Sequence, residues 1–377
     1  MSPIKLHITS KSLNEEEWNA LVNDDLPFLL LSFNRAFEVS HKSNMTHLFY
    51  ISNNPEQQLV GYAQALYLNW QNIHSYQQRN KLSRGIISVL MKLTRIKIVA
   101  MGNGFLTNIQ NVSIKTLNDN IAFLTSLIQT IGNQLNVNNF IFPDHYFNAL
   151  NISKPEDSNP NFIRVEVEED MVLSIKQQWK CFDDYSQSLK KKYKTRQRGV
   201  MKKSRDVLIK KLTLNDIKLH QNRIQQLFLN VQRKASFGAV SFNTNTFQLL
   251  TSLSIPYCNV YGYFLNDTLI GFSSEIYDQS KLYSYFIGLD YQYNVSHRLY
   301  ERILLENINH GIDLGKKEIV FGRTAAEFKS NVGAVPLKSF IYIYVKNPLL
   351  RFILNPILSR IKPKKWVQRS PFKQEQT

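Results

Sequence analysis

The pattern LIGFS at residues 269–273 decides the fold, because it repeats the pattern LVGYA of residues 59–63. Each pattern opens the second arm of a predicted β-hairpin. A second related pair, NFIF at residues 139–142 and EIVF at residues 318–321, follows a long predicted helix in each half of the chain. Because both pairs occur in the same order and setting, we interpret the sequence as a duplication of one mixed α/β domain.

Around these patterns, the sequence predicts the same elements in both halves of the chain. They are helices, a hairpin, a further strand, a long helix and a short buried strand. In the first half, the elements from the hairpin onward lie at residues 46–68, 96–104, 117–135 and 138–144. In the second half they lie at residues 257–278, 281–290, 295–311 and 317–323. Asn118 or Asp119 is the predicted cap of the first long helix, and Asn266-Asp267 is the predicted turn of the second hairpin.

Length and composition favour two ordered domains. The chain has 377 residues, 43% of them hydrophobic and 12% aromatic, which excludes a disordered or low-complexity protein. We predict an N-terminal domain at 1–155 and a C-terminal domain at 160–345, joined by the linker-like KPEDSNPN and followed by a basic tail at 346–377.

The sequence has no hydrophobic signal-peptide core near its start and no apolar run of about 18 residues, the length that a spanning helix needs. Neither the two cysteines, Cys181 and Cys258, nor the scattered histidines have the spacing of metal ligands. We therefore expect a cytoplasmic protein with reduced cysteines and no metal site.

Almost all of the net charge of +17 lies in two segments. Residues 189–211 hold eleven Lys or Arg against one acidic residue, and residues 351–377 hold seven against one. Charge confined in this way indicates two particular anionic contacts rather than general coating of nucleic acid.

The first basic segment predicts a helix with a narrow apolar stripe. One interpretation is a solvated helix face or a general RNA-binding surface. The other is a cationic wall that faces the phosphates of an acceptor, with the nearest side chains being Lys192, Lys194, Arg196 and Arg198. Gly199 is predicted to end or kink this helix.

The second basic segment mixes Leu, Ile and Phe with Lys and Arg and includes KPKKW. This composition is typical of an interfacial membrane helix, with Trp366 at headgroup depth. Pro348 and Pro356 limit the length of the helix. Packing of the tail on the C-terminal domain is the alternative of equal weight.

Three motifs carry a resemblance to a known family. They are YSQSLKKKYK at 185–194 with Arg196 and Arg198, IGLD at 287–290, and FGRTA at 321–325 with Phe328-Lys329 and Gly333. With the element order, they resemble the GNAT superfamily of acyl-CoA N-acyltransferases. Two such units in tandem resemble the FemAB-like, Fem-type transferases of bacterial peptidoglycan biosynthesis. The implied fold is tandem GNAT-like domains, each a mixed central sheet flanked by helices.

The resemblance implies how an acyl donor binds. In GNAT folds two neighbouring parallel strands separate, and the pantetheine arm of acyl-CoA pairs with the exposed backbone. The pyrophosphate would lie at the N-terminus of the helix that begins near Ser296. The implied donor-binding residues are Ile287, Gly288, Leu289, Asn294, Ser296, Phe321 and Gly322. Residues 291–296 replace the usual glycine-rich loop, so the donor is either acyl-CoA or an aminoacyl-tRNA, with no permanently bound cofactor.

The resemblance also assigns chemical roles. Lys329 would stabilise the tetrahedral oxyanion, and Arg323 would hold a phosphate or carboxylate of the acceptor. Glu327 would accept the proton of the amine. Glu275 is a candidate base, or else pairs across strands with a lysine, and Tyr300 is a candidate acid for the leaving group. The alternative for Arg323, Glu327 and Lys329 is a solvated loop with a surface ion pair.

We therefore expect an N-acyltransferase, peripheral at the inner membrane surface, that acts on an amine of an anionic acceptor such as a cell-wall precursor or another lipid-linked substrate. The C-terminal copy would carry the chemistry, and the N-terminal copy would shape the acceptor cleft. The competing hypothesis is a non-enzymatic protein that binds nucleic acid or a membrane surface through its basic helix and tail.

Overall fold

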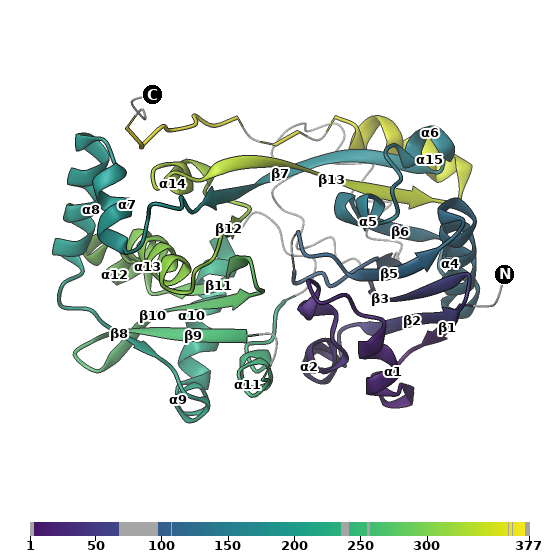
Figure 1. The fold of residues 1–377 in the computed structure, drawn as a ribbon, viewed down its shortest axis with the longest axis horizontal. Helices are drawn as coiled ribbons and strands as arrows, with labels where there is room; N and C mark the ends of the chain where they lie inside the picture. The colour runs from purple at the N-terminus through teal and green to yellow at the C-terminus, as the bar shows by residue number, and fades with distance from the viewer. Residues whose placement is uncertain are drawn as a thin grey trace. The chain divides into compact units, whose positions relative to one another are not determined.

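The structure, a computed structural model, describes residues 4–67, 97–106, 108–234, 241–254, 257–360, 362–363 and 365–373 (Figure 1). The chain divides into two units. The described residues of the first fall in Met1–Val167, Ala235–Asn243 and Ser339–Lys362; those of the second fall in Glu168–Lys234, Thr244–Lys338 and Pro363–Thr377. Neither unit is one continuous segment, because strands β7 (Phe162–Ser174) and β13 (Val335–Val345) each pass from one unit to the other.

The first unit is built on a mixed sheet. Its strands follow the order β1 (Lys5–His7), β2 (Thr46–Asn54), β3 (Gln57–Tyr67), β4 (Lys97–Ala100), β6 (Asn139–Pro143) and the C-terminal part of β13. β5 (Val112–Leu117) pairs with β3 on the same edge as β4. Among the pairings of these described strands, that of β4 with β6 is parallel and the others are antiparallel. The helices are η1 (Ser10–Ser12), α1 (Glu15–Ala20), η2 (Pro27–Leu29), α2 (Leu31–His41), α4 (Asn120–Leu135), α5 (Asp144–Ala149), α6 (Pro155–Ser158) and α15 (Pro348–Leu358).

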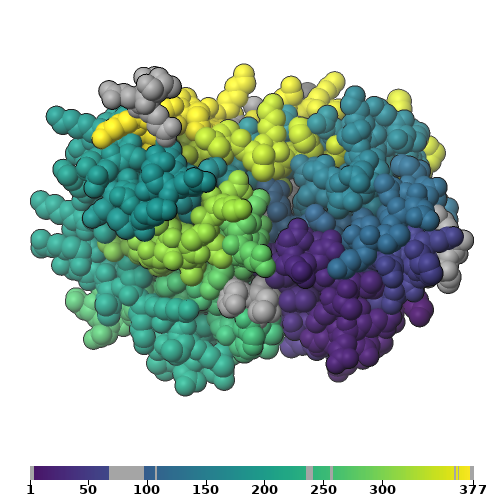
Figure 2. All heavy atoms as spheres, viewed as in Figure 1, coloured from purple at the N-terminus to yellow at the C-terminus, as the bar shows by residue number. Residues whose placement is uncertain are grey.

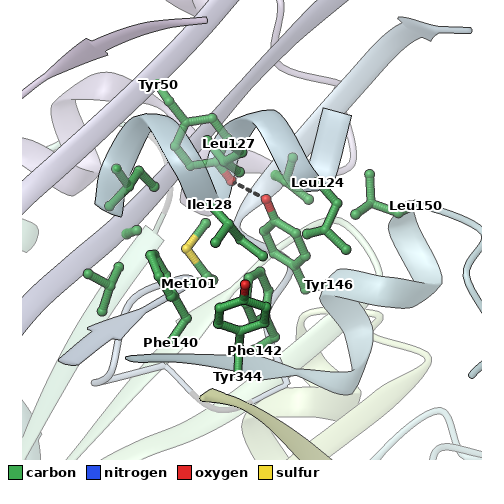
Figure 3. Close-up of a cluster of buried hydrophobic side chains, with 14 of the residues drawn as sticks. Tyr50, Met101, Leu124, Leu127, Ile128, Phe140, Phe142, Tyr146, Leu150 and Tyr344 are labelled. Atoms are coloured by element: carbon green, nitrogen blue, oxygen red, sulfur yellow. Dashed lines mark hydrogen bonds between the residues drawn. The ribbon is translucent and has the colours of Figure 1, made fainter. Parts of the chain in front are cut away.

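Helix α4 covers the core of this unit. Asp119 caps it, as predicted, by accepting a hydrogen bond from the backbone N–H of Ala122. The apolar side of α4 packs against aromatic side chains of β6 and α5 (Figure 3). Within this cluster the buried hydroxyls of Tyr50 and Tyr146 lie 2.8 Å apart, so one donates a hydrogen bond to the other and both have a partner.

The second unit repeats the arrangement. Its strands follow the order β7, β12 (Glu318–Gly322), β11 (Lys281–Leu289), β10 (Thr268–Tyr277), β9 (Tyr257–Leu265) and β8 (Leu208–Lys211). In the part of this sheet that the structure describes, β11 pairs with β12 in parallel and the other pairings are antiparallel. The helices are α7 (Phe182–Ser188), α8 (Lys191–Lys203), α9 (Leu214–Leu219), α10 (Gln221–Lys234), α11 (Thr246–Leu250), α12 (Tyr291–His297), α13 (Leu299–Asp313) and α14 (Ala326–Ser330).

Both predicted hairpins are confirmed. The patterns LVGYA and LIGFS lie in β3 and β10, each the second arm of its hairpin. Asn266 and Asp267 form the second turn with φ angles of 45° and 62°, the left-handed values that a tight hairpin turn requires. The duplicated mixed α/β fold therefore follows the predicted order of elements.

One helix over residues 189–211, with an end or kink at Gly199, was predicted from the sequence, and both parts of this prediction are wrong. α8 runs from Lys191 to Lys203 without a break at Gly199, and residues 208–211 form β8 against β9. A Cβ on Gly199 would lie 3.3 Å from a guanidinium nitrogen of Arg298, so this glycine permits a close approach rather than a helix end.

Among the residues that the structure describes, no helix combines the length and the hydropathy needed to cross a bilayer. Both cysteines are free thiols; Cys258 is buried and Cys181 is exposed.

Candidate functional site

The two parallel strands of the second unit separate. β11 and β12 pair at three positions, the last being Tyr283 opposite Val320. β11 continues to Leu289, but no strand of the described chain pairs with this edge of it beyond Tyr283. The opening that the resemblance predicted between residues 281–290 and 317–323 is therefore present.

Backbone groups of β11 face this opening. The N–H of Asp290 donates to the carbonyl of Ile270 on β10 at 2.9 Å, so alternation directs the backbone groups of Ile287 and Leu289 to the opposite edge. The carbonyl of Leu289 accepts a hydrogen bond from the Asn230 side chain of α10 at 3.2 Å. The backbone of Ile287 is thus in position to pair with an amide-containing ligand.

A β-bulge lies where the strands separate. The register between β10 and β11 shifts between Ser273 and Glu275. The Ser274 hydroxyl accepts a hydrogen bond from the N–H of Phe286 at 2.9 Å and donates to its carbonyl at 2.8 Å. Because a bulge bends and twists its strand, this one turns β11 away from β12.

The equivalent strands of the first unit are arranged differently. β4 pairs with β6 to its end, and the N–H of Met101 extends the pairing by donating to the carbonyl of Ile141 at 2.8 Å. Helix α5 packs against both β5 and β6, with Tyr146 and Phe147 in the core. In the described residues of the first unit, β4 therefore stays paired with β6 where β11 separates from β12 in the second.

The turn after β12 holds a buried lysine. Gly322, Thr324 and Ala325 have φ angles of 74°, 66° and 49°, and left-handed values cost a non-glycine residue about 1–3 kcal/mol. Lys329 of α14 is 5% exposed, and its Nζ donates to the carbonyls of Gly322 at 3.1 Å and Arg323 at 2.6 Å. The two hydrogen bonds of the Lys329 ammonium group therefore stabilise the strained turn.

Two carboxylates of β7 lie near this lysine. Burial lowers the pKa of Lys329 to about 7, although the charges of Asp170 and Glu168 oppose the shift. Asp170 is fully buried, and its Oδ2 lies 3.6 Å from Nε of Arg323. Asp170 was not predicted from the sequence as a site residue. Its signal was an acidic residue directly before the apolar run MVL.

Glu327 is exposed and forms an ion pair with Arg369. Arg369 belongs to the C-terminal segment (residues 366–373), which packs on the second unit. The backbone N–H of Arg369 donates to the Ser330 hydroxyl at 3.3 Å, and Gln368 donates to the carbonyl of Ala334 at 3.0 Å. The C-terminal segment therefore fixes α14. For this part of the tail, packing on the C-terminal domain, one of the two alternatives predicted from the sequence, is confirmed.

The predicted Tyr300 lies beside α14. Its ring is 5.9 Å from that of Phe328, and the Arg196 guanidinium lies 5.9 Å from the same Phe328 ring. Burial raises the pKa of the Tyr300 hydroxyl above its ordinary value, so the group stays protonated. Arg196, Tyr300 and Phe328, which are far apart in the sequence, are thus brought together.

The four predicted basic residues of α8 have different surroundings. Lys192 and Arg198 are exposed, and Lys194 is half-buried. Nε of Arg196 lies 2.8 Å from a carboxylate oxygen of Glu301, so part of its charge is already balanced.

The predicted pyrophosphate site is altered. The long helix begins at Leu299 rather than near Ser296, because α12 occupies the preceding residues and Arg298 breaks the helix with φ 50°. The Asn294 side chain accepts a hydrogen bond from the N–H of Tyr300 at 2.9 Å, and the Ser296 hydroxyl donates to the carbonyl of Tyr293. The predicted helix start at Ser296 is therefore wrong.

Glu275 is fully buried, and the described strands on either side of it place no lysine opposite it. Its register partners are Asn259 and Ser284. One carboxylate oxygen accepts hydrogen bonds from Asn307 at 2.6 Å and His310 at 2.8 Å, both from α13. These contacts make Glu275 part of a buried polar cluster, and the scattered histidines of the sequence gave no sign of its partner.

The pair of His310 and Glu275 is expected to make stability depend on pH. Burial alone would lower the pKa of His310, but Glu275, helped by Glu306 and Asp313, raises it above the ordinary value of 6.5. The charged pair stabilises the fold fully below about pH 6.5, the ordinary pKa of histidine. This stabilisation is lost as the pH rises through the pKa of His310 in the folded state, and a pKa difference of one corresponds to about 1.4 kcal/mol in the free energy of unfolding. Urea denaturation of a His310→Asn variant should show a flatter pH dependence than the wild type; equal slopes would contradict the pairing.

Gly288 was predicted to bind the donor, but its surroundings give it a packing role. A Cβ there would lie 2.2 Å from the Phe272 ring and 2.8 Å from the backbone of Leu227 on α10. We expect Gly288→Ala to destabilise the protein by about 1–3 kcal/mol through overpacking. Gly271→Ala, with a closest contact of 3.3 Å, is the matched control and should cost less in urea denaturation.

No protein-family model and no curated protein matches the sequence. The fold is similar to the solved structure of FemX, with a TM-score of 0.52 at 10% identity over 93% of this chain and 100% of that chain. A conserved protein of unknown function from Bacteroides thetaiotaomicron VPI-5482 matches with a TM-score of 0.51 at 11% identity over 92% and 100%. A tandem GNAT protein from the clavulanic acid biosynthesis pathway matches at 0.48 and 6% identity over 92% and 99%. The fold is thus similar to that of FemX, and its two units repeat one mixed α/β arrangement, as predicted.

Proposed function

We propose that the protein is an N-acyltransferase whose second unit joins an activated acyl or aminoacyl group to an amine on an anionic acceptor. The observation that carries the proposal is the separation of β11 from β12 after Tyr283. An open strand edge of this kind suits the extended, amide-containing arm of an acyl-CoA. The altered pyrophosphate region keeps an aminoacyl-tRNA as the other possible donor.

The proposed reaction forms an amide. The acceptor nitrogen attacks the carbonyl carbon of the thioester or ester, and the C–S or C–O bond breaks as the tetrahedral oxyanion collapses. An ammonium carries three N–H donors, and Lys329 uses two of them on the turn. We assign the third, with the positive charge, to the oxyanion.

Proton transfer completes the reaction. The attacking amine gives its proton to a base, for which exposed Glu327 is the candidate, and the leaving thiolate or alkoxide receives a proton from Tyr300. Arg323 and the exposed Lys192 and Arg198 are proposed to hold phosphate or carboxylate groups of the acceptor. Fully buried Glu275 is better suited to support α13 than to act as the base.

The proposed binding site for the acyl donor can be tested by removing one backbone N–H group from the open edge of β11. Ile287→Pro deletes an N–H that faces away from β10, so the β10–β11 pairing is kept. Loss of one hydrogen bond, about 1 kcal/mol, should weaken donor binding about fivefold. Ile287→Val, which keeps the N–H, is the matched control, and binding of CoA, acetyl-CoA and aminoacyl-tRNA would be measured by calorimetry.

Equal donor affinity in the Pro and Val variants would contradict pairing at this edge. Transfer itself would be followed as release of the CoA thiol or of free tRNA in the presence of amine acceptors. No binding and no transfer with any of these donors would favour the non-enzymatic alternative.

A further inference from the structure

Helix α15 of the first unit has two apolar sides. Leu350, Leu354 and Leu358 pack against the buried cluster of Ile163, Val165 and Val345. The opposite side exposes Leu349, Phe352 and Ile353, with exposed fractions of 69%, 80% and 41%. We call these three residues the outer face of α15. Three large apolar side chains this exposed on one short helix indicate a surface that is covered by a partner.

The charge around the outer face narrows the choice of partner. The sequence contains no Asp or Glu from residue 328 to residue 374. Exposed Lys346, Arg360 and Lys362 flank the helix, whereas Arg351 is held by a hydrogen bond to Asn161. A second copy of the chain would bring the same positive charge to the contact, so the surface fits an anionic partner that also accepts apolar side chains.

We propose that the outer face of α15 binds the surface of an anionic phospholipid bilayer. A helix of 11 residues is too short to span a bilayer, which takes about 20 residues, but it can lie in the interface with its apolar face in the headgroup boundary and its cations among the phosphates. The yellow, C-terminal part of the chain lies at the surface in Figure 2. This inference does not depend on the proposed enzymatic activity.

Trp366 is not part of the proposed membrane contact. The sequence predicted this tryptophan at headgroup depth, but its Nε1 donates to Glu169 at 3.1 Å and its ring packs against the core of the second unit. The two parts of the tail therefore have different partners. We assign α15 to the membrane surface, whereas the C-terminal segment packs on the second unit.

Co-sedimentation with vesicles tests the proposal. The wild-type protein should bind vesicles of phosphatidylcholine mixed with phosphatidylglycerol more tightly than vesicles of phosphatidylcholine alone. The triple variant Leu349→Gln, Phe352→Gln, Ile353→Gln should lower the affinity for mixed vesicles by about tenfold or more. The matched control is Leu208→Gln, Leu219→Gln, Val295→Gln, which removes three exposed apolar side chains of the second unit and should bind like the wild type.

Two further variants locate the contact. Lys346→Gln with Arg360→Gln should reduce the preference for anionic vesicles by about fivefold for each charge removed. In Phe352→Trp, brominated lipids should quench emission beyond the quenching of the wild-type tryptophans. Unchanged binding of the triple variant, no extra quenching, or binding of the wild type to duplex RNA but to neither vesicle would each overturn the proposal.

Discussion

Replacing Lys329 with methionine is expected to lower the rate of acyl transfer by about 10²–10³-fold, the usual cost of removing one group that stabilises an oxyanion. Methionine fills a similar volume but carries neither the charge nor the donors that reach Gly322 and Arg323. Because burial lowers the pKa of Lys329 to about 7, the wild-type rate at saturating substrates should also fall above about pH 7, where the ammonium loses its proton.

The measurement is kcat and KM over a range of pH, with Lys338→Met, a change of an exposed lysine, as the matched control. Urea denaturation of both variants separates loss of folding from loss of chemistry. A folded Lys329→Met protein with wild-type kcat would contradict the oxyanion role and leave Lys329 only as the group that holds the turn.

Asp170→Asn is expected to destabilise the protein by about 3–5 kcal/mol, the range found when one partner of a buried ion pair is removed. Asp170 is fully buried and faces two cationic side chains, Arg323 and Lys329. The neutral amide removes a negative charge that acts on both cations, and it should lower the pKa of Lys329 further, so that transfer falls at a lower pH than in the wild type.

Urea denaturation gives the change in the free energy of unfolding. The matched control is Glu166→Gln on the same strand, where the side chain is half-buried and the effect should be within about 0.5 kcal/mol. If Asp170→Asn were no less stable than Glu166→Gln, the carboxylate would not be the counter-charge of the turn after β12.

The hairpins and the long helices could be predicted because their signals are local. Alternation of apolar residues, the Asn266-Asp267 turn and the Asp119 cap each depend on a few neighbouring residues. The prediction was wrong for residues 208–211, because Leu208 and its neighbours become a strand only by pairing with β9. It was also wrong at Ser296, where the αL conformation of Arg298 divides the helix.

By itself, the sequence determined the duplicated α/β pattern, since apolar periodicity depends only on neighbouring residues. The segments FGRTA and EFK became candidates through their resemblance to a family signature. Only the tertiary structure decided how far β11 and β12 pair, which carboxylate faces Lys329, and which side of α15 is left exposed. The reason is that each of these depends on residues far apart in sequence: a bulge opposite Ser274, an aspartate on β7, and the cluster of Ile163, Val165 and Val345 beneath α15. Burial and pairing of this kind are properties of the packed sheet and not of any single stretch of residues.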